Sequence, residues 1–406
     1  MKPIALVLAA VAVAAAVLAA THTGGRLPTK DVRFTAAGDS VVVPFVLRNN
    51  QVLVRGTIGD SDSLWFIVDS GAGSHCVNMS TAKTLGIDLG EGAEAHGAGG
   101  TVKAGTASDL VYRVKDLTID APFSAAIDLD GVSLQIGVPV GGVLGYPLFE
   151  RTVFTFDYDR SELVLHRPSF RPVGSALPLT FQFNHPYVPG KLTLPGRTAS
   201  AGSFVLDTGS ALALVLSPEF VEKENALTTV PKTLETRLGG VGGLSFQPIG
   251  RVERLELGPY ALERPIAVLS AKGPGSTSGP GSIGNIGGDV LQRFRVTFDY
   301  PRKELRIVPG LAYARAFEAD MTGLILTIRP DGDVPVEVVK VNPGSPAAEA
   351  GIAAGDRVAS VDGKPLAAGD LAGLRKRMKI EGQELHFTLV RGTERPEAVI
   401  VTRRML

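Results

Sequence analysis

The stretch FIVDSGAG, residues 66–73, places an aspartate directly after three apolar residues and directly before a hydroxyl residue and a glycine. The apolar residues predict a buried strand that ends at Asp69. Burying a carboxylate is unfavourable unless a nearby group shares its proton or donates hydrogen bonds to its oxygens. The motif therefore predicts a partner for Asp69 elsewhere in the chain.

A second copy of the motif supplies a candidate partner. The stretch FVLDTGSA, residues 204–211, again runs from three apolar residues into an aspartate, a hydroxyl residue and a glycine. One short D-[ST]-G match is weak evidence because such patterns also occur by chance. Asp207 becomes a strong candidate only if more of the surrounding sequence is repeated.

The sequence downstream of each copy is repeated as well. LGYPLFERTVFTFDYDRSEL begins at Leu144, and IGGDVLQRFRVTFDYPRKEL begins at Ile286; the two align without a gap. A glycine-rich segment precedes each of them, GAGGTVKAG from Gly97 and GGVGGLSF from Gly239. Three elements in the same order, twice, indicate that one structural unit has been duplicated.

Each unit is predicted to be rich in β-structure. Segments such as VVVPFVLRNNQVLVRGTI and PLTFQFNHPYVPGKLTL read as strand pairs around Asn or Pro turns. Helical signals are few and short. One helix is expected after each aspartate motif, capped by Ser80 in the first unit and by Ser217 in the second.

Composition limits the partners and the compartment. Lys and Arg number 41, as do Asp and Glu, so no basic surplus favours nucleic acid. The N-terminus carries one Lys and then an apolar run from Ile4 to Ala20, which predicts a secretory signal peptide or an uncleaved membrane anchor. Cys76 is the single cysteine, so no disulfide within the chain is possible. We expect a periplasmic or secreted bacterial protein, or one held at the inner membrane by its N-terminal segment.

The paired D-S-G and D-T-G motifs resemble those of aspartic proteases. Each motif is preceded by apolar residues and followed much later by an apolar residue and glycine, at Leu144-Gly145 and at Ile286-Gly287. The resemblance covers about residues 40 to 310 and is closest to the glycine-rich, cysteine-poor retropepsin-like and bacterial branch. It implies two lobes that face each other across a cleft. Asn285 departs from the apolar residue usual there, and we expect this to affect packing but not chemistry.

The resemblance also implies roles for particular residues. Two carboxyl groups at hydrogen-bonding distance share one proton, so they can activate a water that attacks a peptide bond. No cofactor and no metal is implied. Residue types at the matching positions give the following assignment: Asp69 and Asp207 as the catalytic pair, Ser70, Gly71, Thr208 and Gly209 as their supports, and Gly99, Gly100 and Thr101 as a flap over the substrate.

Two roles for the glycine-rich segments stay open. The segment from Gly97 to Gly105 matches the flap of the family, although a plain surface hairpin would show the same pattern. The segment from Gly239 is either a second flap or a structural remnant of one. His75 and Cys76 are expected to pack rather than to react, because no metal-ligand spacing or basic cluster accompanies them.

The C-terminal part is similar to bacterial PDZ domains. Residues 338–363 match the pattern V-x-x-V-x-P-G-S-P-A-A-x-A-G-[IL]-x-x-G-D-x-[IV]-x-x-[IV]-[DN]-G almost throughout, and the helix-like DLAGLRKRMK follows. The resemblance implies a groove in which the C-terminus of a peptide adds as an extra strand. Its expected contacts are Gly323, Leu324, Ile325 and Leu326. Loss of ligand binding, with the domain kept for packing, is the alternative.

The predicted fold class is mainly β, with two duplicated aspartic-protease β-lobes that form a cleft, followed by an α+β PDZ domain. We expect an aspartic endopeptidase whose partners are peptide or protein substrates and a C-terminal peptide on the PDZ domain. The alternative is a catalytically silent peptide-binding or scaffold protein. The predicted divisions are a signal peptide or anchor at 1–23, lobes at 38–167 and 176–310, and the PDZ domain at 320–406.

Overall fold

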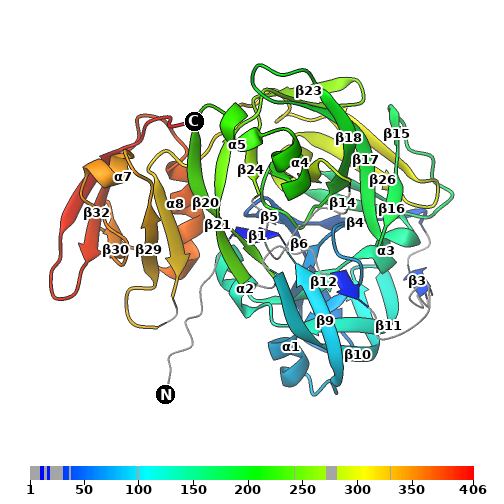
Figure 1. Cartoon of the computed structure of the whole chain (residues 1–406). Coiled ribbons are helices and arrows are strands. Elements are labelled where there is room, and N and C mark those ends of the chain that lie inside the picture. Colours follow the sequence, from blue (N-terminus) through cyan, green and yellow to red (C-terminus); the bar gives the residue numbers. More distant parts are fainter. Residues whose placement is uncertain are drawn as a thin grey trace.

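The structure is a computed structural model that describes residues 10–12, 16–18, 31–35, 38–97, 100–241, 243–270, 281–329 and 331–406. Over this range the protein is mainly β, which confirms the predicted fold class. Figure 1 shows two adjoining β-rich lobes and a smaller C-terminal domain beside them. Gly99 and most of the predicted N-terminal signal segment lie outside the described residues.

The first lobe is built around three strands that position the first aspartate motif. Strand β7 runs into Asp69, β12 lies parallel to β7, and β12 also pairs with β8 in the antiparallel sense. The sheet order is β2-β9-β10-β11-β8-β12-β7-β6-β5, with β3 on β11. Its elements are β2 (Ala16–Leu18), β3 (Asp31–Phe34), β5 (Val46–Arg48), β6 (Gln51–Ile58), β7 (Leu64–Val68), β8 (Cys76–Asn78), α1 (Met79–Thr84), β9 (Gly90–Gly97), β10 (Gly100–Val114), β11 (Leu117–Ile127), α2 (Asp130–Ile136), β12 (Val140–Leu144) and α3 (Tyr146–Glu150).

The second lobe repeats this arrangement. Strand β18 runs into Asp207, β25 lies parallel to β18, and β25 pairs with β19 in the antiparallel sense. The sheet order is β1-β20-β21-β24-β19-β25-β18-β17-β22-β23, with β16 on β17. Its elements are β1 (Ala10–Ala12), β16 (Thr180–Gln182), β17 (His185–Thr193), β18 (Ser200–Leu206), β19 (Leu214–Leu216), α4 (Pro218–Lys223), α5 (Ala226–Thr229), β20 (Thr233–Gly240), β21 (Gly243–Arg251), β22 (Arg254–Leu257), β23 (Tyr260–Glu263), β24 (Ile266–Leu269), β25 (Gly284–Ile286) and α6 (Gly288–Leu291).

A third sheet joins the two lobes, and it is made from the repeated T-F-D-Y segments. Strands β13 and β26 pair so that Thr155 lies opposite Thr297, the residue at the same place in the second copy. The two hydroxyls are 2.8 Å apart and hydrogen-bonded. A local two-fold axis therefore passes between these threonines. The elements are β4 (Ser40–Pro44), β13 (Val153–Asp157), β14 (Glu162–His166), β15 (Ala176–Pro178), β26 (Phe294–Asp299) and β27 (Glu304–Pro309).

Aromatic side chains of this joining sheet form the centre of the core. Phe154 and Phe298 are opposite each other in the register and stack with ring centroids 4.8 Å apart. Phe149 stacks on the other side of Phe154 at 4.1 Å. All three rings are fully buried. Because the two copies contribute these rings to a single cluster, the lobes share one hydrophobic core.

The two helices expected after the aspartate motifs are both present, but only one has the predicted cap. Ser217 accepts a hydrogen bond from Phe220 N at 3.2 Å and caps α4 as predicted. The prediction for Ser80 is wrong, since α1 begins one residue earlier and its N-cap is Asn78. The Asn78 side chain is engaged elsewhere, with Asp130 and with the Leu129 main chain. The N-cap therefore lies two residues before the predicted position at Ser80.

The C-terminal domain forms a separate small sheet with its own core. Leu324, Val338, Phe387 and Ile400 are among its buried residues. In the sheet order β28-β29-β30-β32-β33, with β31 on β30, β28 is a terminal strand among those described. The elements are β28 (Leu324–Ile328), β29 (Val336–Val341), α7 (Pro346–Glu349), β30 (Arg357–Val361), β31 (Lys364–Pro365), the 3₁₀ helix Ala368–Asp370, α8 (Leu371–Arg377), β32 (Glu384–Val390) and β33 (Glu397–Val401).

Two short strands come from the apolar N-terminal run. Strand β1 pairs in parallel with β20, and β2 pairs in the antiparallel sense with β9. Each therefore adds to a strand from one of the two glycine-rich segments. Among the described residues, no helix has the length and apolar character needed to cross a membrane.

We predict that Phe298→Ala destabilises the two-lobed part by about 3–5 kcal/mol, because it empties a fully buried ring position shared by both lobes. Chemical denaturation followed by tryptophan fluorescence measures the shift. Phe183→Ala is the matched control, since that ring is 72% exposed, and its expected change is within about 0.5 kcal/mol. Equal effects of the two substitutions would contradict a shared core at Phe298.

Candidate active site

The two aspartates lie at equivalent points of the two lobes. Asp69 N donates to Leu144 O at 3.0 Å, and Asp207 N donates to Ile286 O at 3.0 Å. The strand that passes beneath each aspartate then continues into a glycine. A β-carbon on Gly145 would lie 2.2 Å from Ser74 O, so the close crossing of these two chain segments requires glycine there.

Hydroxyl groups cross between the two aspartate loops. Thr208 Oγ1 donates to Val68 O at 2.8 Å and accepts from Ser70 N at 2.9 Å. Ser70 Oγ donates to Leu206 O at 2.9 Å and accepts from Thr208 N at 3.1 Å. The Ser70 and Thr208 residues are both buried. The structure thus brings the predicted supports Ser70 and Thr208 together and uses each to fix the opposite loop.

The carboxyl groups lie against the opposite glycines. A β-carbon on Gly71 would lie 2.7 Å from the Asp207 carboxyl, and one on Gly209 would lie 2.3 Å from Asp69 Oδ2. Any larger residue at either position would displace a carboxyl group. Gly71 N also donates to Asp69 Oδ1 at 2.7 Å. The two glycines therefore leave just enough room for two carboxyl groups to meet.

Each lobe also holds the aspartate loop of the other lobe by a side-chain amide. Gln51 Nε2, from the first lobe, donates to Gly209 O at 2.5 Å. Asn184 Nδ2, from the second lobe, donates to Gly73 O at 3.2 Å. These residues were not predicted from the sequence. No motif marks an isolated amide residue, whose partner lies more than a hundred positions away.

The two carboxyl groups have different proton affinities. Both are fully buried. Burial raises the pKa of Asp69 well above 3.8, and the charge of Asp207 and a hydrogen bond with it raise that pKa further. Burial also raises the pKa of Asp207, but hydrogen bonds from Asn285 and Asp69 lower it. The pKa of Asp69 is therefore raised further above 3.8 than the pKa of Asp207 is.

Asn285 corrects one expectation from the sequence. The sequence predicted that this residue affects packing but not chemistry, yet its Nδ2 donates to Asp207 Oδ2 at 2.7 Å. Asn285 lies on β25, directly beside the strand that ends at Asp207. The residue that occupies this position in the first copy is the apolar Val143. The substitution of a polar residue in one copy therefore makes the carboxyl pair unsymmetrical.

His75 and Cys76 are packing residues, as the sequence predicted. His75 is fully buried, its Nδ1 accepts from Gly145 N at 3.2 Å, and burial lowers its pKa to about 3. Cys76 is buried in β8, and burial raises the pKa of its thiol to about 12. Neither side chain carries charge at neutral pH. Among the described residues, no group of three His, Cys, Asp or Glu side chains could hold a metal ion.

Both glycine-rich segments form hairpins. In the first, β9 pairs with β10, with Gly100 opposite Gly97 and Thr101 opposite His96. In the second, β20 pairs with β21, with Gly240 opposite Gly243. The second segment, whose role the sequence left open, thus has the same hairpin form as the first.

The four residues predicted for the PDZ groove lie at the start of β28, facing α8. Two of the main-chain amides there are already engaged by side chains of the same loop. Gly323 N donates to Asp320 Oδ1 at 2.7 Å, and Leu324 N donates to Thr322 Oγ1 at 3.1 Å. Ile325 and Leu326 are buried. The groove opens into a cavity of about 920 Å³ between the C-terminal domain and the two lobes.

Comparison with known protein families agrees with both parts of this description. Residues 54–148 match the family model of aspartyl proteases, and residues 337–391 match that of PDZ domains. The first match includes Asp69 and the returning strand of the first lobe. No curated protein matches the chain significantly. The chain is therefore similar to aspartyl proteases over part of its first lobe and to PDZ domains in its C-terminal part.

We predict that Thr208→Val destabilises the protease part by about 2–4 kcal/mol, because it removes one hydrogen bond and leaves the buried Ser70 N–H without its acceptor. Chemical denaturation measures the loss. Thr228→Val is the control, because that hydroxyl is exposed on α5 and contacts only its own helix turn. A loss no larger than that of the control would contradict a stabilising role for the crossing hydroxyls.

Proposed function

We propose that this protein is an aspartic endopeptidase that cleaves peptides held in extended form between its lobes. One observation carries the proposal: the buried carboxyl of each lobe lies against the glycine of the opposite aspartate loop, and crossing hydroxyls hold the two loops together. The aspartyl protease match of residues 54–148 supports it.

The proposed mechanism follows from the unequal proton affinities of the pair. Asp207, ionised and hydrogen-bonded to Asn285, takes a proton from a water molecule as the water oxygen bonds to the peptide carbonyl carbon. Asp69 gives its proton to the carbonyl oxygen. When the C–N bond breaks, Asp207 passes its proton to the leaving nitrogen, and Asp69 regains one from a hydroxyl of the intermediate. The pair returns to its starting state without a covalent intermediate.

We further propose that the PDZ domain recruits or gates substrate, and that the protein is exported. The PDZ match and the cavity beside β28 support a peptide-binding role for this domain. Export rests on the apolar run after Lys2 in the sequence. The competing proposal is a catalytically silent peptide-binding protein, which would keep peptide affinity and lack hydrolysis.

Asp69→Asn and Asp207→Asn should each lower peptide hydrolysis by about 10³-fold or more, because each removes one partner in proton transfer. The measurement is cleavage of an unstructured protein such as casein, read by mass spectrometry. Both variants should remain folded, as judged by thermal unfolding. Asp289→Asn, just beyond the second loop, is the control and should keep full activity. Undiminished cleavage by either dyad variant would refute the mechanism.

Asn285→Val should shift the acidic limb of the pH–activity profile upward by about one pH unit. The sign follows because the amide stabilises the charged form of Asp207, so its loss raises the pKa of that carboxyl. The enzyme then loses activity at a higher pH as the medium is acidified. Val143→Ala, the equivalent position in the first lobe, should leave this limb in place. Identical limbs in Asn285→Val and the parent would contradict the assignment of Asp207 as the base.

A further inference from the structure

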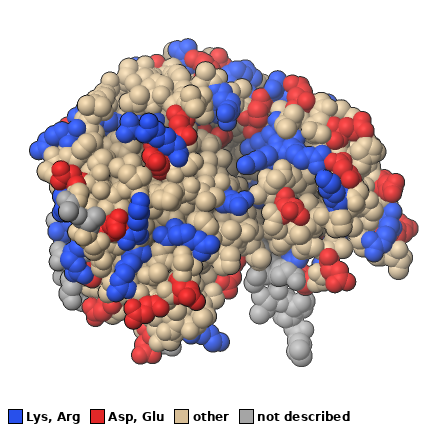
Figure 2. All heavy atoms as spheres, turned by 180° about the vertical axis from the view of Figure 1, so that it is seen from behind, with Lys and Arg blue, Asp and Glu red and all other residues tan. Residues whose placement is uncertain are grey.

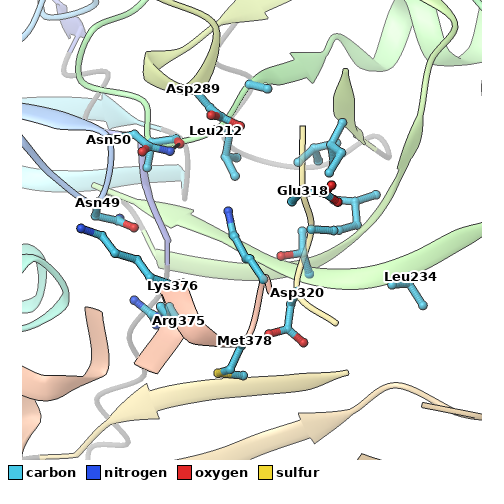
Figure 3. Close-up of a pocket in the computed structure, with 18 of the residues that line it drawn as sticks. Asn49, Asn50, Leu212, Leu234, Asp289, Glu318, Asp320, Arg375, Lys376 and Met378 are labelled. Carbon is cyan, nitrogen blue, oxygen red and sulfur yellow. Dashed lines mark hydrogen bonds between the residues drawn. The ribbon is translucent and has the colours of Figure 1, made fainter. Parts of the chain in front are cut away.

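The cavity between the PDZ domain and the protease lobes has walls from both parts. One wall is formed by β28 and α8 of the PDZ domain, and the facing wall includes β20 of the second lobe. Figure 2 shows the molecule hollowed between its larger and smaller parts, with Lys and Arg side chains gathered beside the hollow. In Figure 3, Arg375 and Lys376 from α8 lie around the same space as Asp320 and Asn49.

Specific contacts fix the two walls relative to each other. Asn342 Oδ1 accepts from Glu235 N at 2.8 Å, and Asn342 Nδ2 donates to Glu235 O at 3.0 Å. The Glu235 carboxylate also forms an ion pair with Lys340. Arg375 connects the PDZ domain to the first lobe. It donates to Gln135 Oε1 of α2 at 3.1 Å and to Leu326 O of β28 at 3.3 Å. Hydrogen bonds and an ion pair therefore hold the walls of the cavity in place, and both lobes take part in these contacts.

Arg237 of β20 lines this cavity, and the part of the chain that the structure describes offers its side chain no hydrogen-bond acceptor. Its residue is only 4% exposed, and none of its three guanidinium nitrogens has a hydrogen-bond partner among the described residues. Burial, with the charges of Arg375 and Arg329, lowers its pKa to about 9. Glu337 is the nearby acid, but it is hydrogen-bonded to Arg329. A buried cation without an acceptor is unfavourable, so this position calls for an anionic group from outside the chain.

Geometry favours an acidic side chain over a free C-terminal carboxylate as that anion. The amides of Gly323 and Leu324, at the entrance of the groove, are occupied by Asp320 and Thr322. Arg237 lies on the opposite wall, on β20, and Arg375 reaches the groove edge of β28 at Leu326 O. A peptide strand added along β28 would therefore present a side chain, not its terminus, to the two arginines.

We propose that the cavity binds an extended peptide along β28 and that Arg237 and Arg375 together receive an acidic side chain of that peptide. Two guanidinium groups suit a carboxylate because each can donate paired hydrogen bonds to its oxygens. Arg237 belongs to the hairpin β20–β21 of the second lobe. Occupation of the site thus contacts the protease part directly. The proposal concerns binding and does not depend on the chemistry of the aspartate pair.

The experiment uses full-length protein carrying Asp207→Asn, so that peptides are not consumed. The probes are fluorescein-labelled ten-residue peptides, otherwise uncharged, in which a single Glu is moved stepwise along the chain. Each has a partner with Gln in its place, and each is made with a free and with an amidated C-terminus. Fluorescence anisotropy measures the dissociation constants. At one register we expect the Glu peptide to bind at least about tenfold more tightly than its Gln partner.

Substitution of the arginines then tests the assignment. Arg237→Gln should lower the affinity for the Glu peptide to that for the Gln peptide and leave the Gln peptide unchanged; Arg375→Gln should act in the same direction. Arg254→Gln, an exposed arginine paired with Glu263 in the same lobe, is the control for loss of charge and should change neither. Amidation of the C-terminus should have little effect.

Several results would overturn the proposal. Equal affinity for Glu and Gln peptides at every register, or no binding of any peptide, would do so. Equal losses for both peptides in Arg237→Gln would assign that residue a structural role only. Discrimination that follows the free C-terminus instead of the Glu side chain would place the anion elsewhere. None of these results bears on hydrolysis by the aspartate pair, so the two proposals fail separately.

Discussion

The structure depends on the burial of two carboxyl groups against each other. Neither Asp69 nor Asp207 is accessible to solvent, and a charge so placed is unfavourable unless its proton is shared or its oxygens accept hydrogen bonds. The crossing hydroxyls of Ser70 and Thr208 provide the necessary rigidity, because they fix the distance between the loops. The glycines at 71 and 209 allow the same close approach, because a larger residue at either position would displace a carboxyl group.

Duplication of one structural unit produces this arrangement, because each copy contributes one aspartate loop. Two copies of one unit meet about a local two-fold axis, marked at one end by Thr155 with Thr297 and at the other by the two aspartate loops. Stacking of Phe154 on Phe298 makes the joining sheet part of one core, so the lobes cannot slide without disturbing it. The symmetry is broken at Asn285, whose amide donates a hydrogen bond to Asp207, while the equivalent residue of the first copy is the apolar Val143.

Sequence motifs predicted what is encoded locally and missed what depends on distant contacts. The repeated D-[ST]-G motifs led to Asp69 and Asp207 because each aspartate follows a recognisable buried strand. For Asn285 the sequence predicted an effect on packing alone. Its amide reaches Asp207 only because β25 lies beside β18 in the folded sheet. No sequence motif marks Arg237, which is buried on β20 where this strand lines the cavity beside the PDZ domain. Ser80 was predicted as a cap because local propensity ignores the contacts of Asn78.

The central claim is that Asp69 and Asp207 share one proton. Carbon-13 NMR of protein labelled at its aspartate carboxyls, titrated with pH, measures this most directly, with the two resonances assigned from single Asp→Asn variants. The account predicts two linked titration steps, with the Asp69 carboxyl still protonated far above 3.8 while Asp207 is ionised. Independent loss of both protons near 3.8, as in exposed aspartates, would contradict it.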